Sequence, residues 1–358
     1  MNIAITGASG HIGAHLCREL LREGHQLRVL VNHFTESLEG LEVERIRGSL
    51  LDPSSLEQLA EGREIFIHLA ASISINGKKE LMDINYQGTL NVIEAVRKTG
   101  VKRLIHFSSI HALTPFPLDT VLDERRELAL KDPLMYSRSK ALAEQAVREA
   151  AIQGMDAVII NPTSVMGPND FKPSLIGQAI LQLYSGKIPA LIPGGYDWVD
   201  VRDVVSGTIA AIEKGKKGES YLLSGSFVSL PDLYAMIRSV KREGKLMGEG
   251  GTPVPGQSKA QRTIEVKRGG KKNSGKKLPV IPFWLAEIGV PFLKAWAWIT
   301  RSTPLYTRES VEILKTAHRN ISSEKAEREL GYHSRPFEET LLETLEWFKE
   351  NGFLRTES

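Results

Sequence analysis

Residues 3–13 read IAITGASGHIG, an apolar run that leads directly into three spaced glycines and then into a helical pattern. Gly7 can form the tight turn after a strand, and Gly10 lets backbone amides approach a phosphate. Gly13 allows close helix packing, and the helix N-terminus adds a partial positive charge. Because strand, glycine spacing and helix agree, the pattern predicts a dinucleotide site rather than an ordinary glycine-containing turn. Its predicted residues are Gly7, Ser9, Gly10, His11, Ile12 and Gly13.

Short apolar runs and helical patterns alternate along the first 160 residues. The apolar runs are 3–6, 27–31, 65–70, 104–107 and 157–160. The helical patterns are 11–23, 83–99 and 134–151. This alternation predicts β-α-β units and a Rossmann-type, doubly wound α/β fold with a parallel sheet. A further apolar run at 221–223 indicates that the chain returns to the sheet before a helix opens at 229–232.

The length of 358 residues exceeds the size at which one hydrophobic core stops growing, so we expect a second lobe. The dinucleotide-binding Rossmann domain is predicted to comprise residues 1–163 and 196–228. The smaller C-terminal substrate lobe, discontinuous in sequence, is predicted to comprise residues 164–195 and 229–348. No internal repeat of solenoid length is present, which argues against a repeat scaffold.

Positive charge is concentrated in residues 241–277, which hold eleven Lys and Arg against three acids. This basic segment contains Gly, Ser and Pro without interleaved aromatics, so we predict a mobile insertion and no nucleic-acid partner. The most apolar stretch, 278–300, is interrupted by prolines and charges, and we expect helices rather than a transmembrane segment. Contact with a membrane surface stays open because of Trp284, Trp296 and Trp298.

The single cysteine, Cys17, cannot form an intramolecular disulfide, and its place in the first helical pattern predicts a buried, inert thiol. The chain is compatible with a reducing compartment. Residues 1–6 already have the pattern of a strand, which leaves no room for a signal sequence at this end. We therefore expect a cytoplasmic protein.

Tyr136 and Lys140 stand at the start of the helical pattern 134–151, and their spacing puts both side chains on one helical face. A free phenol, with a pKa near 10, is a poor proton donor or acceptor at neutral pH. An ammonium group nearby stabilises the phenolate and brings the phenol closer to its working range. The pair predicts a proton-transferring tyrosine supported by Lys140.

Several segments resemble the extended short-chain dehydrogenase/reductases, within the NAD-dependent epimerase/dehydratase family. Besides the glycine spacing, the matching segments are 68–71, 85–92 and 161–168. The resemblance covers nearly the whole chain except 241–277 and is greatest to the dihydroflavonol-reductase-like and sugar-epimerase-like branches. It implies that nicotinamide C4 and a substrate carbon exchange a hydride, and that Lys140 also holds the nicotinamide ribose. Tyr136 would give or take the proton of the substrate oxygen.

The resemblance also implies further site residues. Ser109 is chosen by position as the hydroxyl that polarises the substrate oxygen, with Ser108 as the alternative, and a strand-capping role is open for either. Beyond the glycine loop, the expected cofactor-binding residues are Asn32, Leu50, Leu69, Ala70, Ala71, Asn85, Tyr136, Lys140, Pro162, Thr163 and Ser164. Ser49 stands where the family usually carries an acid that meets the adenine.

The end of the second strand decides between NAD and NADP, because an acid there holds a ribose 2′-hydroxyl and a base favours a 2′-phosphate. This chain has Asn32 and His33 at that place, with Arg28 and Arg47 nearby in sequence. The sequence therefore slightly favours NADP over NAD. The basic residues are equally compatible with ordinary solvent-exposed positions.

Two other functions remain as alternatives. A sugar-nucleotide epimerase or dehydratase would use the same triad, but residues 110–113 lack the acidic or aromatic-glycine pair usual in those enzymes. A non-catalytic module that senses the dinucleotide would typically lack Tyr136 or Lys140. The histidines have no metal-ligand spacing, so no metal is expected. We expect a small-molecule substrate and, through helices at 83–99 and 136–151, a possible homodimer.

Overall fold

The computed structural model describes residues 1–73, 78–186, 188–242, 278–289 and 306–354. Its larger layer is a seven-stranded parallel sheet in the order β3-β2-β1-β4-β5-β6-β9. The strands are β1 (Asn2–Thr6), β2 (Gln26–Val31), β3 (Glu44–Arg47), β4 (Ile65–His68), β5 (Arg103–Phe107), β6 (Ala157–Pro162) and β9 (Ser220–Leu223). The predicted Rossmann-type fold is confirmed, including the return of the chain to the sheet at 221–223.

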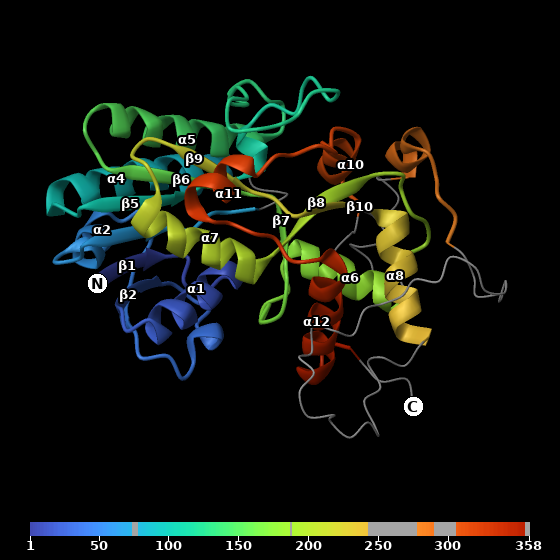
Figure 1. The fold of residues 1–358 in the computed structure, drawn as a ribbon, viewed down its shortest axis with the longest axis horizontal. Coiled ribbons are helices and arrows are strands. Elements are labelled where there is room, and N and C mark those ends of the chain that lie inside the picture. The colour runs from blue at the N-terminus through green and yellow to red at the C-terminus, as the bar shows by residue number, and fades with distance from the viewer. Residues whose placement is uncertain (74–77, 187, 243–277, 290–305, 355–358) are drawn as a thin grey trace.

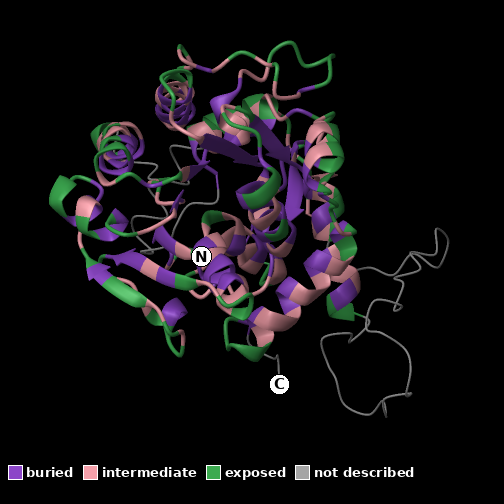
Figure 2. Ribbon diagram, turned by 60° about the vertical axis from the view of Figure 1, so that its left-hand side comes forward, coloured by how far each residue is buried: buried purple, intermediate pink, exposed green. Residues whose placement is uncertain are grey.

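Helices cover both faces of this sheet (Figure 1), which explains why its central strands are apolar throughout. One face carries α1 (His11–Arg22), α7 (Val201–Lys214) and α11 (Glu324–Leu330). The other face carries α2 (Pro53–Ala60), α4 (Gly88–Thr99) and α5 (Met135–Ile152). Figure 2 colours the central strands purple, as buried residues are.

Helix α1 confirms one specific expectation, since Cys17 lies fully buried in it and burial raises the pKa of the thiol to about 12. Strand β3 was not predicted, because Ile46 is its single buried residue and the pattern of Glu44–Arg47 is mostly charged. The predicted helix at 83–99 consists of two parts. A π-helical turn at Met82–Gln87, preceded by α3 (Lys78–Leu81), leads into α4.

A second, three-stranded sheet in the order β10-β8-β7 forms the smaller layer beside the main sheet (Figure 1). Its strands are β7 (Ser164–Met166), β8 (Gly195–Asp200) and β10 (Ser226–Ser229). The helices of this part are α6 (Leu175–Tyr184), α8 (Leu230–Arg242), α10 (Arg308–Lys315), α12 (Phe337–Glu350) and a helix at 283–289. Short 3₁₀ turns lie at Glu36–Leu38 and Ile110–Ala112.

These strands bear on the predicted domain limits. β8 and β10 stand at the two ends of the segment 196–228 that was assigned to the Rossmann domain, yet both belong to the smaller sheet. The exact boundaries therefore stay a prediction. Residues 243–277 of the predicted insertion, together with Trp296 and Trp298, lie outside the described residues. Within the described ranges, none of the helices has both the length and the apolar character needed to span a bilayer.

Candidate functional site

The glycine loop joins β1 to α1 at the carboxyl edge of the sheet, beside the end of β4. Gly7 has a φ of +75°, and a Cβ there would lie 2.6 Å from the backbone nitrogen of Ala70. A Cβ on Gly13 would lie 2.2 Å from the carbonyl oxygen of Gly7, so neither position accepts a side chain without movement. Strands β1 and β4 are neighbours whose following helices cover opposite faces, which is where α/β sheets bind dinucleotides.

Gly10 differs from the other two glycines because it is exposed and a Cβ on it would meet only the Gly7 carbonyl, at 3.3 Å. It is the N-cap of α1 and offers no side-chain hydrogen bond to the first turn. The first amides of the helix are therefore available to an anion. Ser9, His11 and Ile12 are half-buried around it. The loop fits the pyrophosphate group that the sequence predicts.

The carboxyl end of β2 shows which basic residues can approach the adenosine end of a dinucleotide. Asn32 and His33 are exposed there, and Arg47 of β3 stands in register with Val31. Of the two arginines that lie nearby in sequence, Arg28 does not approach this end of β2. Its guanidinium pairs with Glu44 and donates to main-chain carbonyls near the end of α2, away from the carboxyl edge.

A cavity of about 230 Å³ opens beside the glycine loop. Its lining residues are Ser9, Gly10, His11, Phe34, Ser37, Asn169, Phe171 and Lys172. The Lys172 ammonium lies 5.6 Å from the centre of the Phe34 ring, and the Ser37 hydroxyl donates to the carbonyl of Ser9. Sequence reasoning missed Phe34, Ser37 and Lys172, because they come from two loops and carry no local motif.

The other predicted cofactor residues lie around the same edge, with different environments. Leu69 and Ala70 are half-buried and Ala71 is exposed after β4, whereas Leu50 is buried and its carbonyl accepts from Asn91. Asn85 is buried, and its amide is used to join the loop at Ser72 to the Ser139 hydroxyl of α5. The Asn85 side chain therefore links the loop after β4 to α5.

Tyr136 lies in the first turn of α5 and meets the residue that follows β5. The Ser109 hydroxyl lies close enough to the phenol to stabilise its ionised form, while the Ser108 hydroxyl is buried without a partner among the described residues. The geometry thus brings Ser109, rather than Ser108, to the tyrosine. Burial raises the pKa of Tyr136, and the nearby Ser109 hydroxyl opposes that rise in part.

Lys140 lies one helical turn after Tyr136, on the predicted face of α5. Its ammonium donates to the carbonyl oxygen of Phe107 at 2.6 Å. Burial lowers the pKa of Lys140 to about 8, and the nearby Glu144 carboxylate opposes this. The expected lowering of the Tyr136 pKa by Lys140 is not found in this structure, where burial determines the direction of that shift.

A buried hydrogen-bond network holds the main chain at Ser109. The Asn161 amide donates to the Ser109 carbonyl at 3.1 Å and to the Glu144 carboxylate at 2.8 Å. Glu144 is fully buried and also pairs with Arg148. Sequence reasoning missed this network because its members come from α5 and β6, and their contact depends on the packing of those elements.

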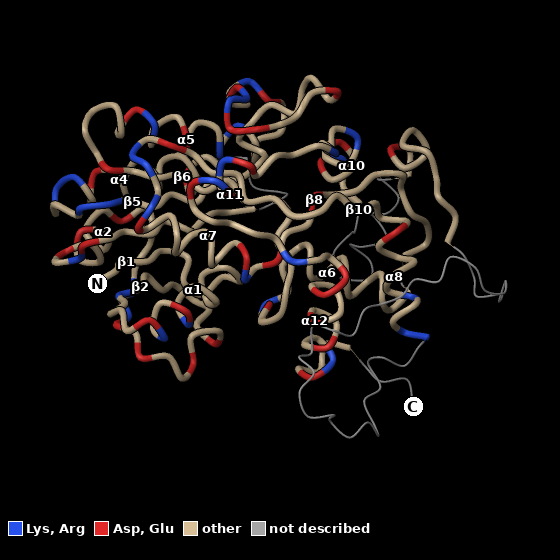
Figure 3. The backbone as a smooth tube through the Cα atoms, in the orientation of Figure 1, with Lys and Arg blue, Asp and Glu red and all other residues tan. Residues whose placement is uncertain are grey.

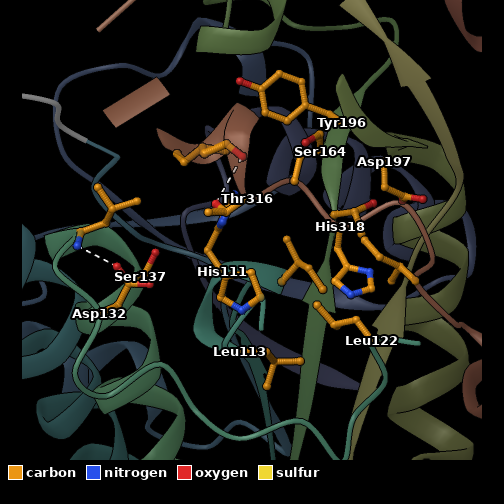
Figure 4. A pocket seen from close by; sticks show the side chains of 17 residues that line it. His111, Leu113, Leu122, Asp132, Ser137, Ser164, Tyr196, Asp197, Thr316 and His318 are labelled. Atoms are coloured by element: carbon orange, nitrogen blue, oxygen red, sulfur yellow. Dashed lines mark hydrogen bonds between the residues drawn. The ribbon is translucent and has the colours of Figure 1, made fainter. Parts of the chain in front are cut away.

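A pocket opens beside the turn after β5 and the start of α5, and residues of β7, β8 and the end of α10 complete its lining (Figure 4). Its apolar lining is Ile110, Leu113, Pro115, Leu122, Leu134, Ile313, Ala317 and Ile321. Its polar lining is His111, Asp132, Ser137, Thr163, Ser164, Tyr196, Asp197, Thr316 and His318. Of the predicted cofactor residues, Thr163 and Ser164 therefore face this pocket, while Pro162 is buried at the end of β6.

His111 connects this pocket to the tyrosine. The two rings meet edge to face with their centres 6.0 Å apart. Burial lowers the pKa of His111 to about 4, so the ring is neutral at pH 7. Two carboxylates also line the pocket, and each accepts a backbone amide: Asp132 from Leu134 at 2.7 Å, and Asp197 from Gly225 at 2.8 Å.

Two other polar features of the sequence have structural partners. Arg202 pairs with Asp200 and Glu343. His68 is buried between the Thr6 and Thr89 hydroxyls. In the described part of the chain, no group of three or more His, Cys, Asp or Glu is arranged to hold a metal ion.

Comparisons with known proteins agree with this architecture. A family model described as the NAD dependent epimerase/dehydratase family matches residues 3–224. The chain is 30% identical to sterol demethylase protein B of Methylococcus capsulatus, over 99% of this chain and 100% of that one. It is 29% identical to a putative dihydroflavonol 4-reductase of Synechocystis sp., over 99% of this chain and 96% of that one.

Among solved structures, the crystal structure of gox2253 superposes with a TM-score of 0.77 at 29% identity and covers 99% of both chains. Other proteins similar to the chain are named as reductases, dehydratases and epimerases. The family match spans the glycine loop, Ser109, Tyr136 and Lys140, and ends beside β9. This chain belongs to the NAD-dependent epimerase/dehydratase family, within the short-chain dehydrogenase/reductases.

Proposed function

We propose that this protein is an NAD(P)-dependent oxidoreductase that transfers a hydride between nicotinamide and a carbonyl or alcohol substrate. The reaction resembles that of a dihydroflavonol reductase, with Tyr136 as acid and base. One observation carries the proposal: Ser109 acts on the Tyr136 phenol, the Tyr136 ring contacts His111 of the pocket lining, and Lys140 lies one turn further along α5. A proton donor, a second hydroxyl and a buried cation thus come together at the start of α5.

The nicotinamide, when bound, supplies or accepts the hydride. In the direction of reduction, the Tyr136 phenol donates its proton to the substrate oxygen. Its raised pKa keeps the phenol protonated at neutral pH, which suits the acid role. The Ser109 hydroxyl donates a hydrogen bond to the same oxygen and stabilises the charge that develops there. In the direction of oxidation, the phenol oxygen takes the proton back.

Lys140 and the network behind Ser109 orient these groups. One N–H of the Lys140 ammonium is fixed on the Phe107 carbonyl, which leaves the others for the ribose of the dinucleotide. Asn161 holds the main chain of Ser109 at its carbonyl. His111 is neutral and packs against the Tyr136 ring, so it contacts the substrate beside the reacting oxygen.

The pocket supports an apolar substrate. Eight of its seventeen lining residues are apolar, and each of its two carboxylates accepts a backbone amide. Residues 110–113, directly after Ser109, also lack the acidic or aromatic-glycine pair usual in sugar-nucleotide dehydratases and epimerases. Two relatives have names that refer to apolar compounds, a sterol and a dihydroflavonol. We therefore propose a reductase function in preference to that of a sugar-nucleotide epimerase or dehydratase.

We also propose NADP rather than NAD as the preferred cofactor. No acid follows β2, so a ribose 2′-phosphate meets no repulsion at Asn32 and His33. Arg47 stands beside the end of β2, and Lys172 lines the cavity next to Ser9. We propose that these two cations, one from β3 and one from a loop, meet that phosphate. A small-molecule substrate, a cytoplasmic location and a homodimer through α4 and α5 complete the proposal.

The test compares wild type with Tyr136→Phe for oxidation of NADPH and NADH by a panel of apolar aldehydes and ketones. The variant removes only the phenolic oxygen, and we expect kcat to fall by about 10²- to 10⁴-fold, as for loss of a general acid. The matched control is Tyr234→Phe on α8, which lies outside the pocket and should retain activity. Turnover that survives Tyr136→Phe would contradict the assigned role, and binding of the cofactor without oxidation by any carbonyl would contradict the reductase.

A further inference from the structure

The pocket beside Tyr136 holds two carboxylates but no fixed positive charge. Of its seventeen described lining residues, none is Lys or Arg, whereas Asp132 and Asp197 are both acidic. The strands β7 and β8, which bring part of the lining, contain no Lys or Arg either, and Figure 3 draws them without blue. The charge of the lining therefore depends on the state of its two histidines.

Both histidines are neutral in this structure, so neither offsets the carboxylates. Burial lowers the pKa of His111 to about 4. The Nδ1 atom of His318 accepts the Asn320 amide at 3.3 Å, which requires that nitrogen to be without a proton. The other ring nitrogen, Nε2, then donates to the Pro117 carbonyl at 3.3 Å. The charges on the lining are thus negative only.

Cations that neighbour the lining in sequence are directed to other partners. Lys315 forms an ion pair with Glu287, and the Arg319 guanidinium lies 5.5 Å from the centre of the Phe227 ring. Lys131 is exposed and is not among the lining residues. None of these three side chains therefore supplies a positive charge to the lining.

Asp197 differs from two other buried carboxylates, Glu144 and Asp200. Glu144 pairs with Arg148, and Asp200 pairs with Arg202. Asp197 is only 9% exposed, yet within the described ranges it has no ion-pair partner. A buried carboxylate without a cation costs free energy unless it accepts enough hydrogen bonds.

The hydrogen bonds that Asp197 accepts within the protein leave part of its capacity unused. Its Oδ1 atom accepts the Gly225 amide at 2.8 Å. Burial raises the pKa of Asp197, and the Gly225 amide and the nearby Thr163 hydroxyl oppose that rise. A carboxylate has about four positions at which it can accept a hydrogen bond. Asp197 can therefore accept a further donor from the pocket that it lines.

Asp197 also lies away from the reacting end of the pocket. The Tyr136 ring contacts His111, with the ring centres 6.0 Å apart. Figure 4 shows Asp197 and His318 on one side of the pocket, and His111 and Ser137 on the other. A substrate group that contacts Asp197 is therefore separate from the oxygen that Tyr136 protonates.

We propose that the substrate carries, away from its carbonyl group, a hydroxyl that donates a hydrogen bond to Asp197, and that the pocket excludes compounds with an anionic group at that place. An ionised carboxylate accepts hydrogen bonds and donates none, so it recognises a donor. It repels a phosphate or another carboxylate, most strongly where burial excludes water.

A hydroxyl fits this position better than an ammonium group. Removing a full charge from water costs more than removing a hydroxyl, and eight of the lining residues are apolar. The inference rests on the proposed function, because it takes the substrate carbonyl to lie at Tyr136. It adds to that function a substrate class, an uncharged carbonyl compound with a second, hydroxylated end.

The experiment measures binding of four matched aldehydes to the full chain by calorimetry, with oxidised cofactor present so that no reduction takes place. The probes carry an ethyl, hydroxymethyl, carboxylate or dimethylaminomethyl group at the end opposite the aldehyde. Each is used as a benzaldehyde and as the longer biphenyl analogue, which covers two distances from Tyr136 to Asp197.

For at least one of the two lengths, we expect the hydroxymethyl compound to bind at least about tenfold more tightly than the ethyl compound, as for a hydrogen bond to a charged group. The carboxylate should bind at least about tenfold more weakly than the ethyl compound, because two like charges would meet in a partly dry site.

Asp197→Asn tests the residue itself, because asparagine keeps an oxygen for the Gly225 amide but loses the charge and presents an NH₂ group. The preference for hydroxymethyl over ethyl should fall to about threefold or less, and the penalty on the carboxylate should disappear. The matched control is Asp232→Asn, the same change at an exposed position of α8 outside the pocket, and it should keep both ratios. Thermal unfolding verifies that each variant is folded, and Asp197→Ser, with the same expected losses, serves if Asp197→Asn is not.

Equal or tighter binding of the ethyl compound at both lengths would overturn the proposal, as would the absence of binding by every probe. Tightest binding of the carboxylate or of the dimethylaminomethyl compound would show that the pocket selects an anion or a cation instead of a hydroxyl. A preference that Asp197→Asn retains would contradict the assignment to Asp197. Because binding is measured without turnover, these ratios can hold even if no hydride transfer is found, so failure of the proposed function is seen separately.

Discussion

Alanine substitutions at Gly10 and Gly13 should have different effects: the first should weaken cofactor binding, and the second should lower the stability of the fold. A Cβ on Gly10 meets a single atom, at 3.3 Å, and the residue has a φ of −75° that alanine adopts readily. Alanine lowers the entropy of the unfolded chain, which adds about 0.4–1 kcal/mol, but it is a poorer N-cap than glycine by a similar amount. We therefore expect Gly10→Ala to change the free energy of unfolding by less than about 1 kcal/mol.

The same methyl group projects from an exposed loop to the place that a pyrophosphate must approach. Loss of one charge-assisted hydrogen bond between a phosphate and a backbone amide costs about 1.5–3 kcal/mol. The Kd for the dinucleotide should then rise by roughly 10- to 100-fold in Gly10→Ala. Gly13→Ala behaves differently, because its Cβ would lie 2.2 Å from the Gly7 carbonyl and 2.8 Å from the Cα of Ala8. Helix α1 must shift by about 1 Å, at a cost of about 1–3 kcal/mol in stability.

The assay is titration of each protein with NADPH, followed by fluorescence, together with thermal unfolding of the same samples. Gly10→Ala should bind weakly and melt like wild type, whereas Gly13→Ala should melt several degrees lower. Dinucleotide affinity in Gly10→Ala equal to that of wild type would refute the assignment of this loop as the pyrophosphate site. A Gly13→Ala protein as stable as wild type would refute the close packing of α1.

Three further predictions address other parts of the site. Lys172→Gln and Arg47→Gln should each raise the KM for NADPH by about 3- to 10-fold and leave the KM for NADH unchanged. Equal effects on both cofactors would contradict recognition of the 2′-phosphate by these residues. The kcat for reduction should be constant below about pH 7 and should fall as the pH rises through about 8, where Lys140 loses its proton. A kcat that rises over that range would contradict the role of the protonated Tyr136 phenol as the acid. Asn161→Leu should lower the free energy of unfolding by about 2–4 kcal/mol, because the buried Glu144 carboxylate and the Ser109 carbonyl both lose a hydrogen-bond donor. Denaturant unfolding measures this loss, and a value under about 1 kcal/mol would show that the network adds little.

Local patterns predicted the parts of the site that lie within one element or one turn. The spacing of Gly7, Gly10 and Gly13 indicated close backbone approaches, and the structure shows the atoms that enforce two of them. The spacing of Tyr136 and Lys140 on one helix predicted a shared face, which α5 confirms. These predictions succeed because turn geometry and helical periodicity depend on neighbours in sequence.

Features that depend on tertiary packing were beyond such patterns. Arg28 is near the end of β2 in sequence, but three residues of extended strand separate positions by roughly 10 Å, and its partners lie elsewhere. Lys172 reaches the cavity beside Ser9 from a loop more than 150 residues away. The contact between Ser109 and Tyr136 likewise required β5 and α5 to be placed. The fold class could be predicted, whereas the charges around the cofactor and the shape of the pocket could not.

The most direct test of the account follows deuterium from NADPH labelled at nicotinamide C4, with each labelled face in turn. The protein is incubated with a panel of apolar aldehydes and ketones and with nucleoside diphosphate sugars, and products are examined by mass spectrometry. We predict one deuterium on the new alcohol carbon for each cofactor oxidised, and loss of this transfer in Tyr136→Phe. Cofactor that keeps both its label and its redox state while a nucleotide sugar is rearranged, or while nothing reacts, would contradict the central claim.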